Sequence, residues 1–249
     1  MSESNKRNFI VHGSILAIAG ILVRIIGMLY RIPIVNIIGS EGNGIYGAAF
    51  NIYNIMLVLS SYGLPMAVSK LVSARFTKKR YKSAAKVLRC SLMVAVCTGG
   101  IAALLVFFGA SFIENVIYGG GLPGLAIPLR ILAPTIFLVA ILGVIRGFFQ
   151  GQSTMIPTAV SQILEQIVNA IVSIAAGYGM MKAFASSPDV AAYGAAGSTL
   201  GTAMGALTAV LFMGFLYAVY TPTFNRLKRK DRHTENQSTG QICKIIIYT

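Results

Sequence analysis

Residues 126–181 read AIPLRILAPTIFLVAILGVIRGFFQGQSTMIPTAVSQILEQIVNAIVSIAAGYGMM. They hold two apolar runs, 126–148 and 156–181, joined by a short polar segment. Each run is near the roughly 20 residues that a helix needs to cross the hydrocarbon core of a bilayer. No strand-like alternation competes, and helices satisfy their own backbone hydrogen bonds in lipid. The stretch therefore predicts a pair of transmembrane helices.

Four more apolar runs of similar length flank this pair, at 9–32, 44–68, 87–108 and 194–220. The whole chain of 249 residues is 55% hydrophobic and only 11% charged, whereas soluble domains carry about 25% charged residues. This composition argues against a soluble enzyme, and it excludes disorder, which needs low hydrophobicity. The sequence predicts an all-α integral membrane protein with six transmembrane helices.

The basic residues indicate an orientation. The chain has 21 Lys and Arg against 7 Asp and Glu, a net charge of +14. With the N-terminus in the cytoplasm, the outer ends of the helices hold only Arg31, Arg130 and Lys182, and Arg24 lies within the membrane. All other cations fall on the inner side: Lys6, Arg7, Lys70, Arg75, Lys78, Lys79, Arg80, Lys82, Lys86, Arg89, Arg146, Arg226, Lys228, Arg229, Lys230, Arg232 and Lys244. Such a bias predicts a multi-pass protein of the cell membrane with both termini inside.

This orientation divides the chain into three parts. We expect a cytoplasmic N-terminus at 1–8, a six-helix lobe at 9–220 with a basic cytoplasmic loop at 70–86, and a basic cytoplasmic segment at 221–249. Topology and attraction to anionic lipids explain the basic segments, so we expect no nucleic-acid partner. Residues 242–249 resemble the first turns of a seventh helix, which indicates a fragment or a prematurely ended chain; a short amphipathic tail is the alternative.

Two arginines in the first run stand out, because a charged residue in the membrane is costly. Arg24 lies deep in the run and Arg31 lies seven residues later, nearly two turns, so both share one helix face. Arginine suits bidentate recognition of phosphate. We predict an anion-binding role for Arg24 and for Arg31, although Arg31 is nearer the outer interface and snorkelling is its alternative.

A polar stripe marks the fifth run. Gln162, Glu165, Gln166 and Asn169 have the spacing of one helical face, which must line a cavity or pair with another helix. Glu165 is the only acid within a predicted span, and it fits a counter-ion to an arginine, a proton carrier or a neutral hydrogen-bonded acid. In the second run Asn51 and Asn54 suggest a second polar wall, or else interhelical hydrogen bonds.

Small residues recur at four-residue spacing in two runs, as Gly143, Gly147 and Gly151 and as Gly197, Gly201 and Gly205. Such stripes let helix backbones approach closely. The pattern G-x-G-x-x-G at 42–47 lacks the strand that a dinucleotide site needs, so we expect a turn there, in an outside loop. The three cysteines, Cys90, Cys97 and Cys243, have no metal-binding spacing and are expected to be packing residues.

The chemistry-bearing residues are too few for an enzyme. The two histidines, three cysteines and seven acids assemble no catalytic triad, paired carboxylates or metal-binding set. A P-loop is absent from the sequence. We therefore predict no enzymatic activity, no catalytic residue, no metal and no cofactor.

Three stretches carry a specific resemblance: RGFFQG at 146–151 with MIPTA at 155–159 and SQILEQ at 161–166, VRIIGMLYR at 23–31, and SSYGLP at 60–65 with AVSK at 67–70. The first and third resemble polysaccharide-biosynthesis flippases of the stage V sporulation protein B type. The second resembles the helix 1 motif of the related lipid II flippases. Both groups belong to the multidrug/oligosaccharidyl-lipid/polysaccharide exporter superfamily, and the match extends over residues 9 to 225.

The resemblance implies one lobe of a larger transporter. Family members have two pseudo-symmetric lobes with the substrate cavity between them, so the second lobe is missing from this chain. In the lipid II flippases, helix 1 arginines bind the pyrophosphate of the lipid-linked substrate, a role that carries over to Arg24 and Arg31. The other cationic cavity residues of that branch have no match, since Asn51 and Asn54 stand in the second run.

The implied function is flipping of a lipid-linked oligosaccharide by alternating access, driven by an ion gradient or the membrane potential. One alternative is a cation-coupled drug exporter of the same superfamily, although organic cations fit poorly beside Arg24 and Arg31. Another is a non-transporting membrane scaffold, in which the glycine stripes mediate association. A membrane-embedded enzyme is the least supported interpretation.

Overall fold

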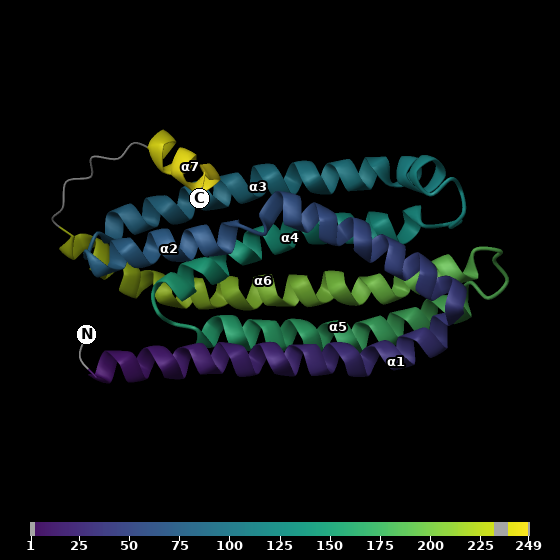
Figure 1. The fold of residues 1–249 in the computed structure, drawn as a ribbon, viewed down its shortest axis with the longest axis horizontal. Helices are drawn as coiled ribbons and strands as arrows, with labels where there is room; N and C mark the ends of the chain where they lie inside the picture. Colours follow the sequence, from purple (N-terminus) through teal and green to yellow (C-terminus); the bar gives the residue numbers. More distant parts are fainter. Residues whose placement is uncertain (1–2, 232–238, 249) are drawn as a thin grey trace.

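The computed structural model describes residues 3–231 and 239–248, and these residues are helical apart from short connections. The long helices lie side by side in an elongated bundle (Figure 1). In chain order the elements are α1 (Glu3–Ser61), α2 (Leu64–Thr77), α3 (Tyr81–Phe112), the short π-helix η1 (Ile113–Ile117), α4 (Ala126–Gly151), α5 (Ile156–Ala183), α6 (Val190–Lys230) and α7 (Thr239–Tyr248).

Helix α1 bends sharply at Gly39. This glycine has φ 70° and ψ −176°, a combination that residues with a side chain essentially never adopt. The first arm runs the length of the bundle, and the second arm turns back from its far end (Figure 1). The first two predicted spans are thus not separate helices joined by a loop. The expected turn at 42–47 is helical, and Gly42 lies against the Ala191 carbonyl at the start of α6.

The other four predicted spans are confirmed as α3, α4, α5 and α6, each longer than the apolar run it contains. Within the described residues, five helical stretches are long and apolar enough to cross a membrane, of which the first is Gly13–Thr77, with 65 residues. As one straight helix it would be roughly 100 Å long, which no bilayer matches, and the bend resolves this excess. The chain is therefore an all-α, multi-pass membrane protein.

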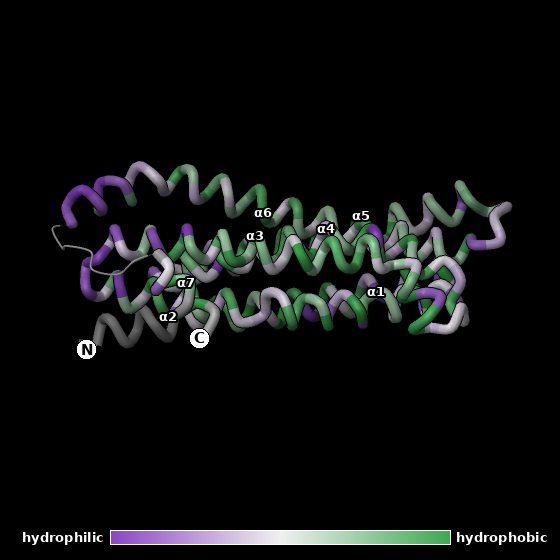
Figure 2. Tube along the Cα trace, turned by 90° about the horizontal axis from the view of Figure 1, so that it is seen from above, coloured by the Kyte–Doolittle hydropathy of each residue, from purple (hydrophilic) through white to green (hydrophobic). Residues whose placement is uncertain are grey.

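The stretch 70–86, expected as a basic loop, is mostly helical. Only Lys78–Arg80 leaves the helices, in a tight turn between α2 and α3 where Lys79 has φ 55°. Hydrophilic residues gather at this end of the bundle, where α6 also ends, while the middle is largely apolar (Figure 2). The most basic segments of the chain thus meet at one end.

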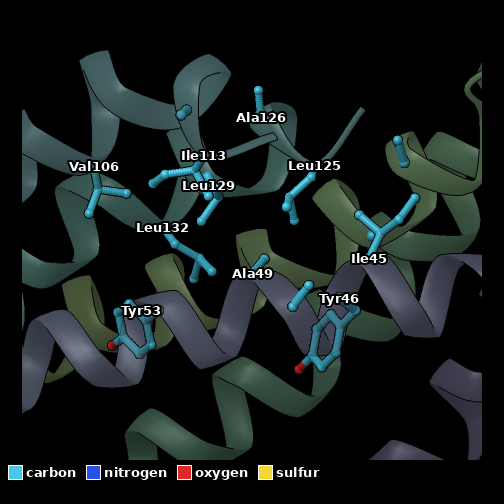
Figure 3. Close-up of a cluster of buried hydrophobic side chains, with 14 of the residues drawn as sticks. Ile45, Tyr46, Ala49, Tyr53, Val106, Ile113, Leu125, Ala126, Leu129 and Leu132 are labelled. Atoms are coloured by element: carbon cyan, nitrogen blue, oxygen red, sulfur yellow. The ribbon is translucent and has the colours of Figure 1, made fainter. Parts of the chain in front are cut away.

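Two buried clusters hold the bundle together. One joins the second arm of α1 to α3 and α4 and includes Ile45, Leu129 and Leu132 (Figure 3). The other lies toward the basic end and is rich in aromatic rings: Phe148 and Phe224 pack at 5.4 Å between centroids, and Phe224 stacks on Phe76 at 6.1 Å. These contacts tie α2, α4 and α6 together at the end where the cations gather.

Both glycine stripes are helix contacts within this chain. A Cβ on Gly205 would lie 2.6 Å from the Glu165 carbonyl, and one on Gly147 would lie 2.5 Å from the Pro65 carbonyl. Neither distance is tolerable, so only glycine permits α6 to lie on α5 and α4 to lie on α2. The predicted packing role is confirmed, and the partner helices are identified.

Helix α7 packs on α3 and α2 and buries Ile242 and Ile246. Cys90 is buried, Cys97 is exposed, and Cys243 is partly buried; all three are free thiols. The buried position of Cys90 agrees with a packing residue, whereas the exposure of Cys97 does not. The continuation of α7 as a seventh transmembrane helix stays a prediction.

Candidate functional site

The polar stripe of α5 lies between α6 and the first arm of α1. Behind it, the glycines of α6 bring the two backbones together, so α5 has a fixed rotation. Asn169 is the best connected member of the stripe: its Nδ2 donates to the Tyr30 hydroxyl of α1 at 3.2 Å. Its Oδ1 accepts from the hydroxyls of Ser173, at 2.9 Å, and Thr202, at 3.4 Å. A single buried amide therefore links three helices.

Glu165 forms an ion pair with Arg146 of α4. Nη2 of Arg146 donates to Oε2 of Glu165 at 2.7 Å, and the two side chains are only 14% and 26% exposed. Nε of Arg146 donates to the Ser161 hydroxyl at 2.9 Å, and that hydroxyl donates to the Thr158 carbonyl at 2.8 Å. The guanidinium is thus held by two groups of α5, and Glu165 acts as a counter-ion.

The arginines of α1 flank the same stripe without entering it. A Cβ on Gly27 would lie 3.3 Å from Nε2 of Gln166, so this face of α1 lies against α5. Arg24 and Arg31 each stand about one turn from Gly27, before and after it, on the same face, and both side chains are exposed. Neither makes a hydrogen bond or ion pair with another described residue. Gln162 is partly buried on α5, one turn before Gln166.

Among the described residues, Asn51 and Asn54 of the predicted polar wall make no hydrogen bond with the α5 stripe. Asn51 and Asn54 are exposed on the second arm of α1, whereas Tyr46 and Tyr53 on the same arm are buried. The tyrosine hydroxyls point out of the aliphatic cluster, on the side opposite Leu125 (Figure 3). The Tyr46 hydroxyl interacts with that of Tyr30, so the phenols, rather than the amides, connect this arm to the α5 network.

Two members of the site were not found from the sequence. Arg146 was counted among the inner-side cations, and Tyr30 was part of a motif without a role of its own. A signal existed for Arg146: it precedes the polar stripe in the same helical pair, and Glu165 needs a cation. Nothing in the spacing identified which of several arginines would supply it.

The site leaves an excess of positive charge. Glu165 neutralises Arg146, and among the described residues no other acid belongs to a predicted span. Within the described part of the chain no group of three His, Cys, Asp or Glu lies together to hold a metal. Exposed guanidinium groups beside amides and hydroxyls are suited to bind an anion that also offers hydrogen-bonding groups.

Comparison with known proteins defines the class. Residues 10–240 match the family described as "Polysaccharide biosynthesis protein", and the chain belongs to this family, whose members are transporters rather than enzymes. Among its relatives in Bacillus subtilis (strain 168), lipid II flippase MurJ is 34% identical over 176 residues, 68% of this chain and 32% of MurJ. Stage V sporulation protein B is 30% identical over 210 residues, 84% of this chain and 39% of that protein.

Two further similarities cover nearly the whole chain. The uncharacterized membrane protein YabM of the same organism is 29% identical over 247 residues, 98% of this chain and 44% of that protein. A solved MOP superfamily transporter from Pyrococcus furiosus Vc1 (DSM3638) shares the fold with a TM-score of 0.71 and 17% identity, over 94% of this chain and 49% of that one. The chain thus spans about half or less of the length of the proteins it matches, and its fold is half of a MOP transporter.

Proposed function

We propose that this chain is the N-terminal lobe of a flippase that moves a lipid-linked oligosaccharide across the cell membrane, with its N-terminus in the cytoplasm. The observation that carries the proposal is the state of three arginines. Arg146 is neutralised by Glu165 at 2.7 Å, whereas Arg24 and Arg31 are exposed on α1 and make no hydrogen bond or ion pair with another described residue.

An exposed arginine within an apolar helix needs an anion or water. Insertion of one such residue at mid-membrane costs about 2.5–3.5 kcal/mol, and that cost is offset when the guanidinium meets a phosphate in a shared cavity. In our proposal, Arg24 and Arg31 bind the pyrophosphate of the lipid-linked substrate. The prenyl tail stays in lipid while the cavity, completed by a second lobe, changes access from one side to the other.

The uncharged polar side chains suit the remainder of such a substrate. Sugar hydroxyls both donate and accept hydrogen bonds, as do the amides of Asn51, Asn54, Gln162 and Gln166. We propose that these amides line the cavity, and that Glu165 and Asn169 serve mainly to hold α4, α1 and α6 on α5. In the absence of a P-loop in the sequence, the proposed energy source is an ion gradient or the membrane potential.

Binding of a polyprenyl diphosphate tests the proposal. The chain is placed in nanodiscs of a zwitterionic lipid, and the affinity is measured by native mass spectrometry. Arg24→Ala and Arg31→Ala should each weaken binding about tenfold or more, because each removes a hydrogen bond from a charged donor. Lys182→Ala, which removes an exposed cation outside the site, should leave binding unchanged, and the polyprenyl alcohol should bind weakly to all variants. Unaltered binding by the double arginine variant would exclude the anion role.

A further inference from the structure

A second basic feature lies at the end of the bundle, away from the α1 arginines. An open cleft of about 570 Å³ lies between the first turn of α3 and the last turns of α6, and it is lined by Lys82, Asn225, Lys228 and Arg229. We propose that this cleft is a binding site for the phosphate headgroup of an anionic membrane lipid. The site is distinct from the proposed transport cavity and does not depend on it.

The cleft is built on a rigid base. Nζ of Lys228 lies over the ring of Phe224, 5.1 Å from its centroid, and Phe224 is 1% exposed within the aromatic cluster. The end of α6 is joined to the start of α3, since Oδ2 of Asp231 accepts a hydrogen bond from the Lys82 backbone N–H at 2.9 Å. The two walls are therefore held in register across a sequence separation of 149 residues.

The cleft is positively charged and is therefore suited to bind an anion. Among the described residues, its lining has three cationic side chains and one amide, and no carboxylate. The nearby acid, Asp231, is 5% exposed and bonds the first turn of α3. Its carboxylate therefore stabilises the helix N-terminus rather than filling the cleft. Three cations and an amide donor around one opening match a phosphate, which offers several acceptor oxygens.

The depth of the cleft favours a lipid over a soluble phosphate. The apolar run of α3 begins at Val87, one to two turns after Lys82, and that of α6 ends at Tyr220, one to two turns before Asn225. Each turn advances about 5.4 Å, and the headgroup layer is roughly 5–7 Å thick on each side of the hydrocarbon. Lys82 and Asn225 therefore stand about 7.5 Å beyond the apolar runs, at the outer edge of the headgroup layer, and Lys228 and Arg229 stand one turn further out. Their long side chains can reach back toward the lipid phosphates.

Lipid retention in mixed nanodiscs tests this site. The chain is placed in discs of equal parts phosphatidylglycerol and phosphatidylcholine, and native mass spectrometry measures which lipid stays bound. We expect retention of phosphatidylglycerol, with its affinity lowered about fivefold for each cation removed by Lys82→Gln or Arg229→Gln. Asn225→Asp places a carboxylate in the cleft without removing a cation, and it should weaken binding as well.

A matched pair of substitutions separates a site from diffuse attraction. Arg130→Gln combined with Lys182→Gln removes the same charge from the opposite end and should leave phosphatidylglycerol retention unchanged. The matching double variant in the cleft is Lys82→Gln with Arg229→Gln. Equal losses in this double variant and in the one at the opposite end would overturn the proposal, as would retention that is unchanged by Asn225→Asp. Soluble glycerol 3-phosphate should compete only weakly, and competition as strong as that of the lipid would overturn the lipid as the occupant.

Discussion

Three arginines on neighbouring helices could pair with Glu165, and in the fold its partner is Arg146. The guanidinium of Arg146 reaches the carboxylate from α4, while Arg24 and Arg31 stay exposed on α1. The spacing of the α5 stripe predicted that Glu165 would face another helix or a cavity. The identity of its partner depends on how α4 is rotated against α5, which no local pattern contains. The counter-ion role was foreseen among three options, but Arg146 was not.

Removal of the carboxylate should destabilise the lobe. Surface ion pairs contribute about 0–1 kcal/mol, and breaking a buried pair costs about 3–5 kcal/mol. With side chains 14% and 26% exposed, the pair lies between these cases. We therefore expect Glu165→Gln to lower the free energy of unfolding by about 1–3 kcal/mol, measured by denaturant titration in micelles with circular dichroism.

Two further variants show whether the loss of stability comes from an unpaired charge. Replacing both partners, as Arg146→Met with Glu165→Leu, leaves no unpaired charge and should restore most of the stability. Glu41→Gln changes an exposed acid outside the spans and should shift stability by less than about 0.5 kcal/mol. A Glu165→Gln protein as stable as the parent would mean that the pair does not hold α4 on α5.

At the scale of elements, apolar length predicted four helices well and one boundary poorly. Polar segments separate the apolar runs of α3 to α6, so these helices can be predicted from the sequence. The bend in α1 is harder to predict, because Gly39 interrupts the helix at a single residue without a loop. Pro33, a conventional warning of a break, lies inside the first arm. The glycine stripes predicted close packing, while only the fold shows that α5 and α2 are the partners.

Two glycines of α6 offer a matched test of this packing. A Cβ on Gly201 would lie 2.5 Å from the Asn169 carbonyl, whereas one on Gly214 would meet nothing within 4 Å. Gly201→Ala should therefore destabilise the chain by about 1–3 kcal/mol, and Gly214→Ala should be neutral or stabilising by up to about 1 kcal/mol. The same micelle titration measures both. Equal stabilities for the two variants would contradict the contact between α5 and α6.

At the scale of the whole molecule, composition and apolar runs were enough to predict a multi-pass membrane protein, whereas the assignment to one lobe came from the family resemblance. The 55% hydrophobic content and the clustering of cations reflect the lipid and water around the chain, so they indicate a membrane protein without any knowledge of helix contacts. The number of membrane crossings follows less directly from the sequence. The described residues hold five long apolar helical stretches, and they make six crossings only if the second arm of α1 continues through α2 as one return path.

Cysteine accessibility tests both that path and the orientation. After the three native cysteines are replaced by alanine, single cysteines are placed at Ser40, Thr77 and Ser186, all exposed positions outside or at the ends of the apolar runs. Because most cations lie at the end that holds Thr77, the basic end should face the cytoplasm. A membrane-impermeant maleimide added to intact cells should then label residues 40 and 186, and label residue 77 only after lysis. The reverse pattern would invert the lobe, and labelling of 40 and 77 from the same side would show that the second arm and α2 do not cross the membrane together.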